Sequence, residues 1–352
     1  FILKINKKIY YQVYKDLALL LTTSGSTGSP KLVRLSYDNL FSNTHSIINY
    51  LEINETHRTI TTLPFNYSYG LSIINTHIHA GASIVMNDFS MIQKFFWENF
   101  CFNEITSFGG VPYNYEILKE IKFENFFLDY FKYSTVAGGS LSLSTLEYFI
   151  KLYKKLNKKL LVMYGQTEAS PRISYLPWEK IEKKKGSIGI PIPGGKLYIK
   201  GELSNKLKLN YSGELIYEGP NVCLGYSNSF KDLSLESKNN NILHTGDIAT
   251  KDKENFFYIV GRLKRIAKIY GIRISLDEIE EELKNNDILA ASIEKNNQIY
   301  IYVTKNKDIK LVKQIVNKKM KISAKLTKIK IINKIPYTPN GKYDYFILES
   351  NY

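Results

Sequence analysis

Apolar segments rich in β-branched residues alternate with helical patterns through the first 260 residues of the chain. Three of these segments, residues 17–24, 133–140 and 159–168, begin as strand-like runs and end in short polar or glycine-containing loops. A repeated strand, loop and helix predicts an α/β fold, in which ligands bind beyond the carboxyl ends of the strands. The loops at these strand ends are therefore where a binding site is expected.

The pattern changes twice further along the chain. Residues 196–200, 213–219 and 254–261 read as short strands separated by turns, which predicts a small β subdomain. From about residue 265 a compact α+β unit follows, with an acidic helix, strands and a lysine-rich helix. The predicted organisation is a large α/β amino-terminal core with its β subdomain, residues 1–262, and a small α+β carboxy-terminal domain, residues 263–352.

The spacing of the cysteines and the length of the apolar runs indicate the compartment in which the protein is expected. Cys101 and Cys223 form no CxxC pair, which excludes a disulfide framework and indicates small buried thiols in a reducing cytoplasm. The longest apolar runs, such as residues 17–21, fall far short of the ~20 residues that a membrane span needs. Residues 1–10 show no secretory signal pattern. We expect a cytoplasmic protein that is not inserted in a membrane.

The net charge of +15 raises the question of a polyanionic partner. Between residues 303 and 334, 11 lysines accompany one acid, Asp308. No RRM, KH, zinc-finger or helix-turn-helix pattern is present, so nucleic acid is not the expected partner. A solvated lysine face and a surface for an acidic protein both remain open.

The stretch "TTSGSTGSPK", residues 22–31, has the composition of an anion-binding loop. Its glycines allow successive backbone N–H groups to point into one concavity, its hydroxyls add donors, and its lysine adds a charge suited to phosphate. The pattern is not a Walker A loop, because no GxxxxGK[ST] is present. A flexible polar turn is the alternative. The candidate ligands are Thr22, Thr23, Ser24, Gly25, Ser26, Thr27, Gly28 and Lys31.

A second polar cluster, "YGQTE", ends the strand-like run at 159–168. Tyr164 offers a flat face for a base, Thr167 a hydroxyl for phosphate, and Glu168 a hard oxygen for Mg²⁺. One carboxylate is weak support for a metal site, and an ordinary loop is the alternative.

Four further charged residues lie in loops or turns of the second half of the chain. Asp247 follows a glycine in "HTGD" and would suit a ribose diol, although turn aspartates are common. Arg262 and Arg273 form either a surface pair or two guanidiniums directed at one anion. Lys342 lies in a Pro/Gly loop, where most lysines are simply solvated.

Taken in order, these stretches closely resemble the motifs of the ANL superfamily of adenylate-forming enzymes. They are the loop at 22–31, "YGQTE", "GELIYEGPNVCLGY", "HTGD", "GRLKR" with "GIR", and the terminal "NGK". The superfamily includes acyl-CoA synthetases, peptide synthetase adenylation domains and luciferases, and the resemblance extends from about residue 18 to residue 346. It implies an AMP-forming acid–thiol ligase that uses ATP and Mg²⁺ and then transfers the acyl group to a thiol.

The resemblance also implies roles for individual residues. Residues 22–31 would close over the β- and γ-phosphates, and Thr167 and Glu168 would contact the α-phosphate and Mg²⁺. The adenine and acyl pocket would be lined by Gly138, Gly139 and Tyr164, and the ribose would be held by Asp247 and Arg262.

Two lysines would serve the conformational cycle that the resemblance implies. Lys342 would bridge the carboxylate, the α-phosphate and the ribose, and Lys264 would lie at the hinge of a mobile carboxy-terminal domain. Rotation about that hinge would remove Lys342 after adenylation and bring in the region around Gly271.

The sequence departs from the superfamily in places. Relatives carry a long segment before the phosphate loop, whereas residues 1–21 precede it here, which indicates an amino-terminal truncation. A catalytically inactive ATP-binding remnant is therefore the alternative to an active ligase. Leu32 and Ser275 replace glycine and glutamate of many relatives, but neither is expected to touch the substrates.

The acid and the acceptor are less constrained than the reaction. Asn66 stands where amino-acid-activating relatives have an aspartate, so an ordinary α-amino acid is disfavoured. Tyr67 and Tyr69 are candidates for the wall or gate of a carboxylic acid pocket, or are simply packing aromatics. The expected acceptor is coenzyme A or the phosphopantetheine of an acidic acyl carrier protein. The motifs look most like stand-alone ligases encoded with surface-glycan genes, and electrostatic steering would favour a carrier protein.

A metal site at His77 and His79 is disfavoured, because their spacing on a helix directs the two side chains apart.

Overall fold

The computed structural model describes residues 12–22, 31–126, 128–201, 212–237, 239–338 and 342–351. Six candidate ligands of the phosphate loop therefore lie outside the described residues: Thr23, Ser24, Gly25, Ser26, Thr27 and Gly28. The side chain of Arg273 also lies outside them, although its backbone belongs to a strand.

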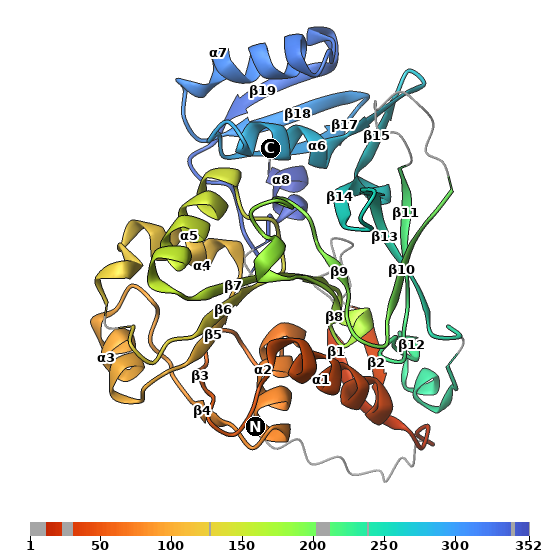
Figure 1. Cartoon of the computed structure of the whole chain (residues 1–352). Helices are drawn as coiled ribbons and strands as arrows, with labels where there is room; N and C mark the ends of the chain where they lie inside the picture. Colours follow the sequence, from red (N-terminus) through yellow and green to blue (C-terminus); the bar gives the residue numbers. More distant parts are fainter. Residues whose placement is uncertain are drawn as a thin grey trace, which may run out of the picture.

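A seven-stranded sheet forms the centre of the molecule, in the order β4-β3-β5-β6-β7-β8-β9 (Figure 1). The strands from β4 to β7 run parallel, and β8 and β9 are antiparallel to their neighbours. This arrangement confirms the α/β fold class. The bounds in sequence order are β3 (Arg58–Ile60), β4 (Ser83–Val85), β5 (Ser107–Gly110), β6 (Tyr133–Val136), β7 (Lys159–Gly165), β8 (Arg172–Leu176) and β9 (Ile190–Pro191).

Helices cover both faces of this sheet (Figure 1). The larger hydrophobic cluster joins three helices to one face through Phe96, Leu118 and Phe149. A smaller cluster joins two helices to the other face through Tyr50 and Tyr69. The first group is α3 (Lys94–Phe102), α4 (Pro112–Glu120) and α5 (Leu143–Leu156), and the second is α1 (Tyr37–Leu51) and α2 (Ser68–His79).

Local signals in the sequence set the helix ends. Ser36 accepts a hydrogen bond from the backbone N–H of Asn39, and the Asn39 side chain accepts one from Ser36 N–H, which completes a capping box. Helix α1 is therefore capped at Ser36. Helix α2 ends at His79, just before Gly81, whose φ of +68° allows the chain to turn.

Two antiparallel sheets flank the central one. The first has the order β1-β2-β12 and places the phosphate loop between β1 (Leu17–Thr22) and β2 (Leu32–Ser36), with β12 (Gly225–Ser227) beside β2. The second has the order β10-β11-β13-β14 and forms the predicted β subdomain. Its bounds are β10 (Lys196–Lys200), β11 (Gly213–Glu218), β13 (Ile242–Lys251) and β14 (Phe257–Arg262).

The carboxy-terminal residues build their own core, drawn in blue at the top of Figure 1. Hydrophobic residues between Ala267 and Ile322 pack into one cluster that contains no residue from the central sheet. The boundary after residue 262 stays a prediction. The elements are β15 (Ile266–Ile269), β16 (Ile272–Ser275), α6 (Leu276–Lys284), β17 (Ala290–Lys295), β18 (Gln298–Val303), α7 (Asp308–Lys313), a π-helical continuation (Gln314–Lys319), β19 (Thr327–Ile331) and α8 (Tyr345–Asn351).

Single 3₁₀ turns complete the described elements: Phe123–Asn125, Thr167–Ala169, Trp178–Lys180, Phe230–Ser234, Leu263–Arg265 and Ala324–Leu326.

Two expectations change in detail. Asp247 does not follow a glycine turn; it lies within β13, where Gly246 has a φ of +70° and the strand register shifts nearby. Cys223 is buried as expected, but Cys101 is only half-buried, and neither forms a disulfide. Within the described part of the chain, no helix is long and apolar enough to cross a bilayer.

Candidate active site

A pocket of about 480 Å³ lies beyond the carboxyl ends of β6 and β7, where the sequence predicted a site. Loops from both halves of the chain line it, and seven of its residues were candidates in the sequence. These seven are Thr22, Asn66, Tyr67, Tyr69, Gly138, Thr167 and Lys342. The remaining wall is supplied by Ser68, Ala137, Gly165, Gln166, Pro171 and Arg172.

Lys342 reaches this pocket from the last loop before α8. Its loop is held by Thr338, whose backbone N–H donates to the Lys342 carbonyl at 2.7 Å. Burial lowers the pKa of Lys342, and the positive charge of Arg262 lowers it further, against the raising effect of Asp247 and Glu168. A desolvated cation facing Thr167 across a pocket is well placed to neutralise an incoming anion.

Thr167 and Glu168 sit in the 3₁₀ turn that follows β7. The Thr167 hydroxyl lies 3.2 Å from the hydroxyl of Ser68, the first residue of α2. Glu168 Oε1 accepts a hydrogen bond of 2.7 Å from the Tyr226 hydroxyl, and Lys31 Nζ lies 5.3 Å from the centre of the same tyrosine ring. Lys31, at the end of the phosphate loop, is thereby linked to the predicted metal ligand through Tyr226.

No group of three His, Cys, Asp or Glu side chains able to hold a metal occurs among the residues the structure describes. Mg²⁺ is commonly bound through one or two carboxylates, with water and substrate phosphates completing its octahedron. A single carboxylate at Glu168, beside the phosphate loop, fits that mode of binding. One carboxylate is too few ligands for a metal site formed by protein side chains alone.

A separate polar cluster surrounds the Asp247 carboxylate, which is buried. Arg262 Nε lies 2.9 Å from Oδ1, while Oδ2 accepts hydrogen bonds from the Tyr164 hydroxyl and, at 3.0 Å, from Gln166 Nε2. Burial, and next the charge of Asp247, raises the pKa of Tyr164 well above its ordinary value, so its hydroxyl remains a donor. Each carboxylate oxygen therefore has a protein partner, and the half-exposed Arg262 side chain remains open to solvent.

The glycines of "AGGS" lie at the end of β6 and shape the pocket differently. Gly138 has a φ of +86°, and a Cβ there would lie 2.7 Å from the Tyr67 hydroxyl. Gly139 packs against Pro112 instead and does not line the described pocket. Tyr67 and Tyr69 stand edge to face with ring centres 6.2 Å apart, and both line the pocket. Asn66 is exposed at the pocket rim.

The predicted hinge residue, Lys264, is exposed in the 3₁₀ turn between β14 and β15. Its neighbour Arg265 anchors the carboxy-terminal unit: Arg265 donates to Asp277 at 2.8 Å and to Glu280 at 2.5 Å, and it lies 3.7 Å over the Tyr345 ring. The turn is thus fixed on its carboxy-terminal side, which suits a pivot at residue 264.

Four residues of the site were missed in the sequence: Ser68, Gln166, Arg172 and Tyr226. Gln166 and Tyr226 fall inside motifs that the sequence analysis quotes. Their polar side chains, within these motifs, could have identified them as site residues. Arg172 and Ser68 had no comparable signal, because their meeting with the pocket depends on how β8 and α2 pack.

Comparison with known proteins agrees with this architecture. Residues 11–227 match the family model described as AMP-binding enzyme. A solved structure of O-succinylbenzoate coenzyme A synthetase from Bacillus subtilis, in complex with ATP and magnesium, has a TM-score of 0.77 and 23% identity, covering 98% of this chain and 72% of that one. The fold is thus that of an adenylate-forming enzyme, and the chain belongs to the AMP-binding enzyme family.

Curated relatives give more particular likenesses. The oxalate–CoA ligase of Saccharomyces cerevisiae is 28% identical over 93% of this chain and 62% of its own length. The long-chain-fatty-acid–CoA ligase of Bacillus subtilis is 30% identical over 78% of this chain and 49% of its own length. The chain therefore spans about half to three fifths of the curated relatives it matches.

Proposed function

We propose that this chain is the catalytic part of an AMP-forming acid–thiol ligase. In the first step a carboxylate oxygen bonds to the α-phosphorus of ATP while the bond to the β-phosphate oxygen breaks, giving an acyl-adenylate and pyrophosphate. In the second step a thiol attacks the acyl carbon, and AMP leaves. Both steps are redox-neutral and need no reactant beyond the acid, ATP and the thiol.

The observation that carries this proposal is the meeting of Lys342 and Thr167 in one pocket from distant parts of the chain. Joining a carboxylate to a triphosphate brings two anions together, and fixed cations and hydroxyl donors lower the cost of that approach. Curated relatives named as CoA ligases and a solved neighbour that binds ATP and magnesium support the same reaction class.

The described residues divide the work of binding ATP. Asp247 and Arg262 would hold the ribose, and Tyr164, fixed by its bond to Asp247, would present its ring to the base. Thr167 would donate to the α-phosphate, and Lys31 would approach the outer phosphates together with residues 22–30. Lys342 would then contact the reacting carboxylate and the α-phosphate.

Glu168 would hold Mg²⁺ against these phosphates, with Tyr226 fixing the orientation of its carboxylate. The ion, when bound, would neutralise the charge of the triphosphate and of the departing pyrophosphate.

The second step requires Lys342 to withdraw, and three contacts of α6 and the turn after it with the α4–α5 region suit such a release. These contacts are polar and exposed: the Ser140 hydroxyl donates to Glu281 at 2.9 Å, Ser144 donates to Asp287 at 3.0 Å, and Lys284 donates to the Ser140 carbonyl. Exposed contacts of this kind exchange readily for water. We propose coenzyme A or a carrier-protein phosphopantetheine as the acceptor, with an acidic carrier favoured by the lysine-rich carboxy-terminal unit, and a cytoplasmic location.

The test is acid-dependent ATP–pyrophosphate exchange with Mg²⁺, using small fatty, hydroxy, dicarboxylic and amino acids. It is run on the 352-residue chain and on a version extended by any coding sequence found upstream. Exchange that disappears in K342A would support the proposal. A folded, extended protein that exchanges with no acid would overturn it in favour of an inactive ATP-binding remnant. Exchange by the extended version alone would support the reaction and assign the missing part of the site to upstream residues.

A further inference from the structure

Arg172 is a buried arginine whose positive charge has no carboxylate partner among the described residues. Its relative exposure is 3%, and it begins β8 at the back of the candidate pocket. Its Nε donates to Met163 Sδ at 3.3 Å, a weak acceptor, and its side chain also hydrogen-bonds to the neutral Tyr50 hydroxyl. Among the other arginine side chains that the structure describes, Arg58, Arg262 and Arg265 pair with carboxylates, and Arg34 donates to backbone carbonyls.

Aromatic rings surround the Arg172 guanidinium instead of anions. Its carbon lies 4.1 Å from the centre of the Tyr69 ring, and its charge acts on the hydroxyls of Tyr50 and Tyr67. Burial raises the pKa of Tyr69 to about 12 and raises the pKa values of Tyr50 and Tyr67 despite that charge. All three hydroxyls are therefore neutral at physiological pH, and none can serve as a counter-ion.

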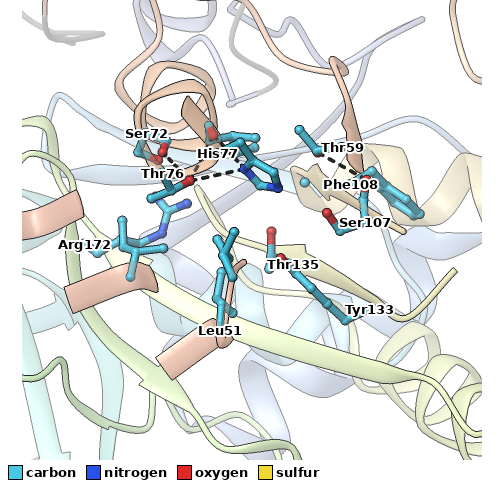
Figure 2. Close-up of a pocket in the computed structure, with 14 residues that line it drawn as sticks. Leu51, Thr59, Ser72, Thr76, His77, Ser107, Phe108, Tyr133, Thr135 and Arg172 are labelled. Carbon is cyan, nitrogen blue, oxygen red and sulfur yellow. Dashed lines mark hydrogen bonds between the residues drawn. The ribbon is translucent and has the colours of Figure 1, made fainter. Parts of the chain in front are cut away.

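A second cavity, of about 290 Å³, is also lined by Arg172, so Arg172 contributes to both spaces. Figure 2 shows the Arg172 side chain among the residues of this inner cavity, with its guanidinium directed toward Thr76. Tyr69 lines the outer pocket, and its hydroxyl donates at 2.8 Å to the carbonyl of Thr135, which lines the inner cavity. The inner cavity therefore adjoins the candidate active site at Arg172.

The inner cavity is lined by three polar side chains that are each at least nine-tenths buried: His77, Ser107 and Tyr133. Ser107 and Tyr133 interact with each other, whereas His77 Nε2 has no hydrogen-bond partner within the described structure. His77 Nδ1 lies 2.8 Å from the Ile73 carbonyl, which can only accept, so Nδ1 carries the proton and Nε2 is a free acceptor. Burial lowers the pKa of His77 to about 4, which keeps this form neutral. An unsatisfied buried polar atom beside a cavity indicates a polar occupant.

We propose that the acid activated by this protein is short and carries a second carboxylate, which pairs with Arg172 at the junction of the two cavities. This proposal rests on the ligase function proposed above and names its substrate class. The reacting carboxylate would lie between Thr167 and Lys342 in the outer pocket, and the body of the acid would pass Tyr67 and Tyr69. His77, Ser107 and Tyr133 would accept or donate hydrogen bonds to its polar substituents.

A long aliphatic acid does not suit this arrangement. Its chain would cover Arg172 with hydrocarbon and leave a buried charge without a counter-ion, which is strongly unfavourable. An α-amino acid is disfavoured as well, because its ammonium group would approach the same cation. A second negative charge satisfies Arg172 directly.

The experiment compares acids of equal carbon number that differ in the second carboxylate: propanedioate with propanoate, butanedioate with butanoate, and pentanedioate with pentanoate. Acid-dependent ATP–pyrophosphate exchange gives kcat/KM for each acid with wild type, R172Q and R172K. The matched control is R34Q, which removes another buried guanidinium, one that bonds backbone carbonyls away from the pocket.

We expect wild type to prefer the dicarboxylate of at least one pair by tenfold or more. R172Q should lower kcat/KM for that dicarboxylate roughly 30-fold or more, as expected for removing one partner of a buried charge pair, and should change the monocarboxylate far less. R172K should recover part of the preference, and R34Q should leave the preference ratio unchanged.

Two results would overturn the inference while leaving the ligase function intact. One is wild-type exchange that favours monocarboxylates or does not distinguish the members of each pair. The other is an equal loss for both members of a pair in R172Q, which would make Arg172 a ligand of the reacting carboxylate or a structural residue. If R172Q does not fold, the ratio of kcat/KM for dicarboxylate and monocarboxylate in wild type decides whether the inference holds. Exchange with no acid of any class would instead overturn the ligase function itself.

Discussion

The hydroxyl of Tyr226 donates a hydrogen bond of 2.7 Å to Oε1 of Glu168, and the same tyrosine ring lies under the ammonium group of Lys31. Partial burial and then the charge of Glu168 raise the pKa of Tyr226, so the hydroxyl remains a donor. One side chain from β12 therefore orders two residues, from different loops, that are proposed to bind phosphate and metal. The proposed Mg²⁺ ligand is fixed by a partner that is not itself a ligand.

Y226F tests this relationship. Removing the hydroxyl leaves the ring under Lys31 but frees the Glu168 carboxylate to rotate, so we expect about tenfold weaker Mg²⁺ activation, as for other partners of metal ligands. The measurement is the Mg²⁺ concentration at half-maximal exchange activity at fixed ATP. Y198F, on β10, is a control that removes an exposed tyrosine hydroxyl. An unchanged Mg²⁺ dependence in Y226F would show that Glu168 needs no such support.

G138A tests whether the space beside Gly138, at the end of β6, must stay free of a side chain. Alanine at a φ of +86° is strained by about 1–2 kcal/mol, and its Cβ would lie 2.7 Å from the Tyr67 hydroxyl that lines the pocket. We expect a lower melting temperature together with at least a tenfold loss of exchange activity, since this contact pushes Tyr67 into the substrate space. G194A is a matched control, with a φ of +83° and no atom within 4 Å of the added Cβ. It should lose similar stability and keep its activity; equal activity in the two variants would contradict the steric argument.

The position of the site could be predicted from the sequence because it depends on local patterns. A strand followed by a polar, glycine-containing loop places Gly138 and Thr167 at one edge of a parallel sheet, whatever the details of packing. The meeting of Lys342 with Thr167 followed from the resemblance to known motifs and from no pattern within the chain.

The inner cavity could not be predicted, for a physical reason. Arg172, His77 and Ser107 come from β8, α2 and β5, and each taken alone is an ordinary polar residue in an apolar segment. Only the packing of α2 on the sheet brings them around one space. That no described carboxylate pairs with Arg172 is likewise a property of the folded surroundings, since the composition of the chain, with 33 acidic residues, does not indicate it.

K342A tests the role of the terminal loop. Lysine removal where charge develops in a transition state costs several kcal/mol, so ATP–pyrophosphate exchange should fall about 100-fold or more. Transfer of the acyl group from a supplied acyl-adenylate to a thiol should be nearly unchanged, because that step needs Lys342 to withdraw. K334A removes an exposed lysine near the same loop and should retain both activities. Equal losses in the two half-reactions of K342A would indicate a structural role.

The titration of Lys342 predicts an alkaline limit to adenylation. The protonated lysine is the active form, so kcat/KM for ATP should fall as pH rises through the pKa of the free enzyme. Because burial lowers that pKa, the fall should begin below the ordinary lysine value of about 10.4. K342R, whose side chain stays protonated, should react more slowly and lose this alkaline fall. If the fall persists unchanged in K342R, another group is responsible.

The lowered pKa of His77 predicts how the free energy of unfolding depends on pH. Its pKa is lowered from 6.5 to about 4 in the folded protein, so between these values the unfolded chain binds one more proton than the folded one. The free energy of unfolding should therefore fall as pH is lowered from about 6.5 to about 4, with this histidine contributing roughly 3 kcal/mol of the change. Urea titrations across this range measure it. H77Q should flatten the slope, whereas H79Q, at an exposed position on the same helix, should not. Equal slopes in wild type and H77Q would mean that the inner cavity already admits a protonated imidazole, and the neutral acceptor beside Arg172 would have to be abandoned.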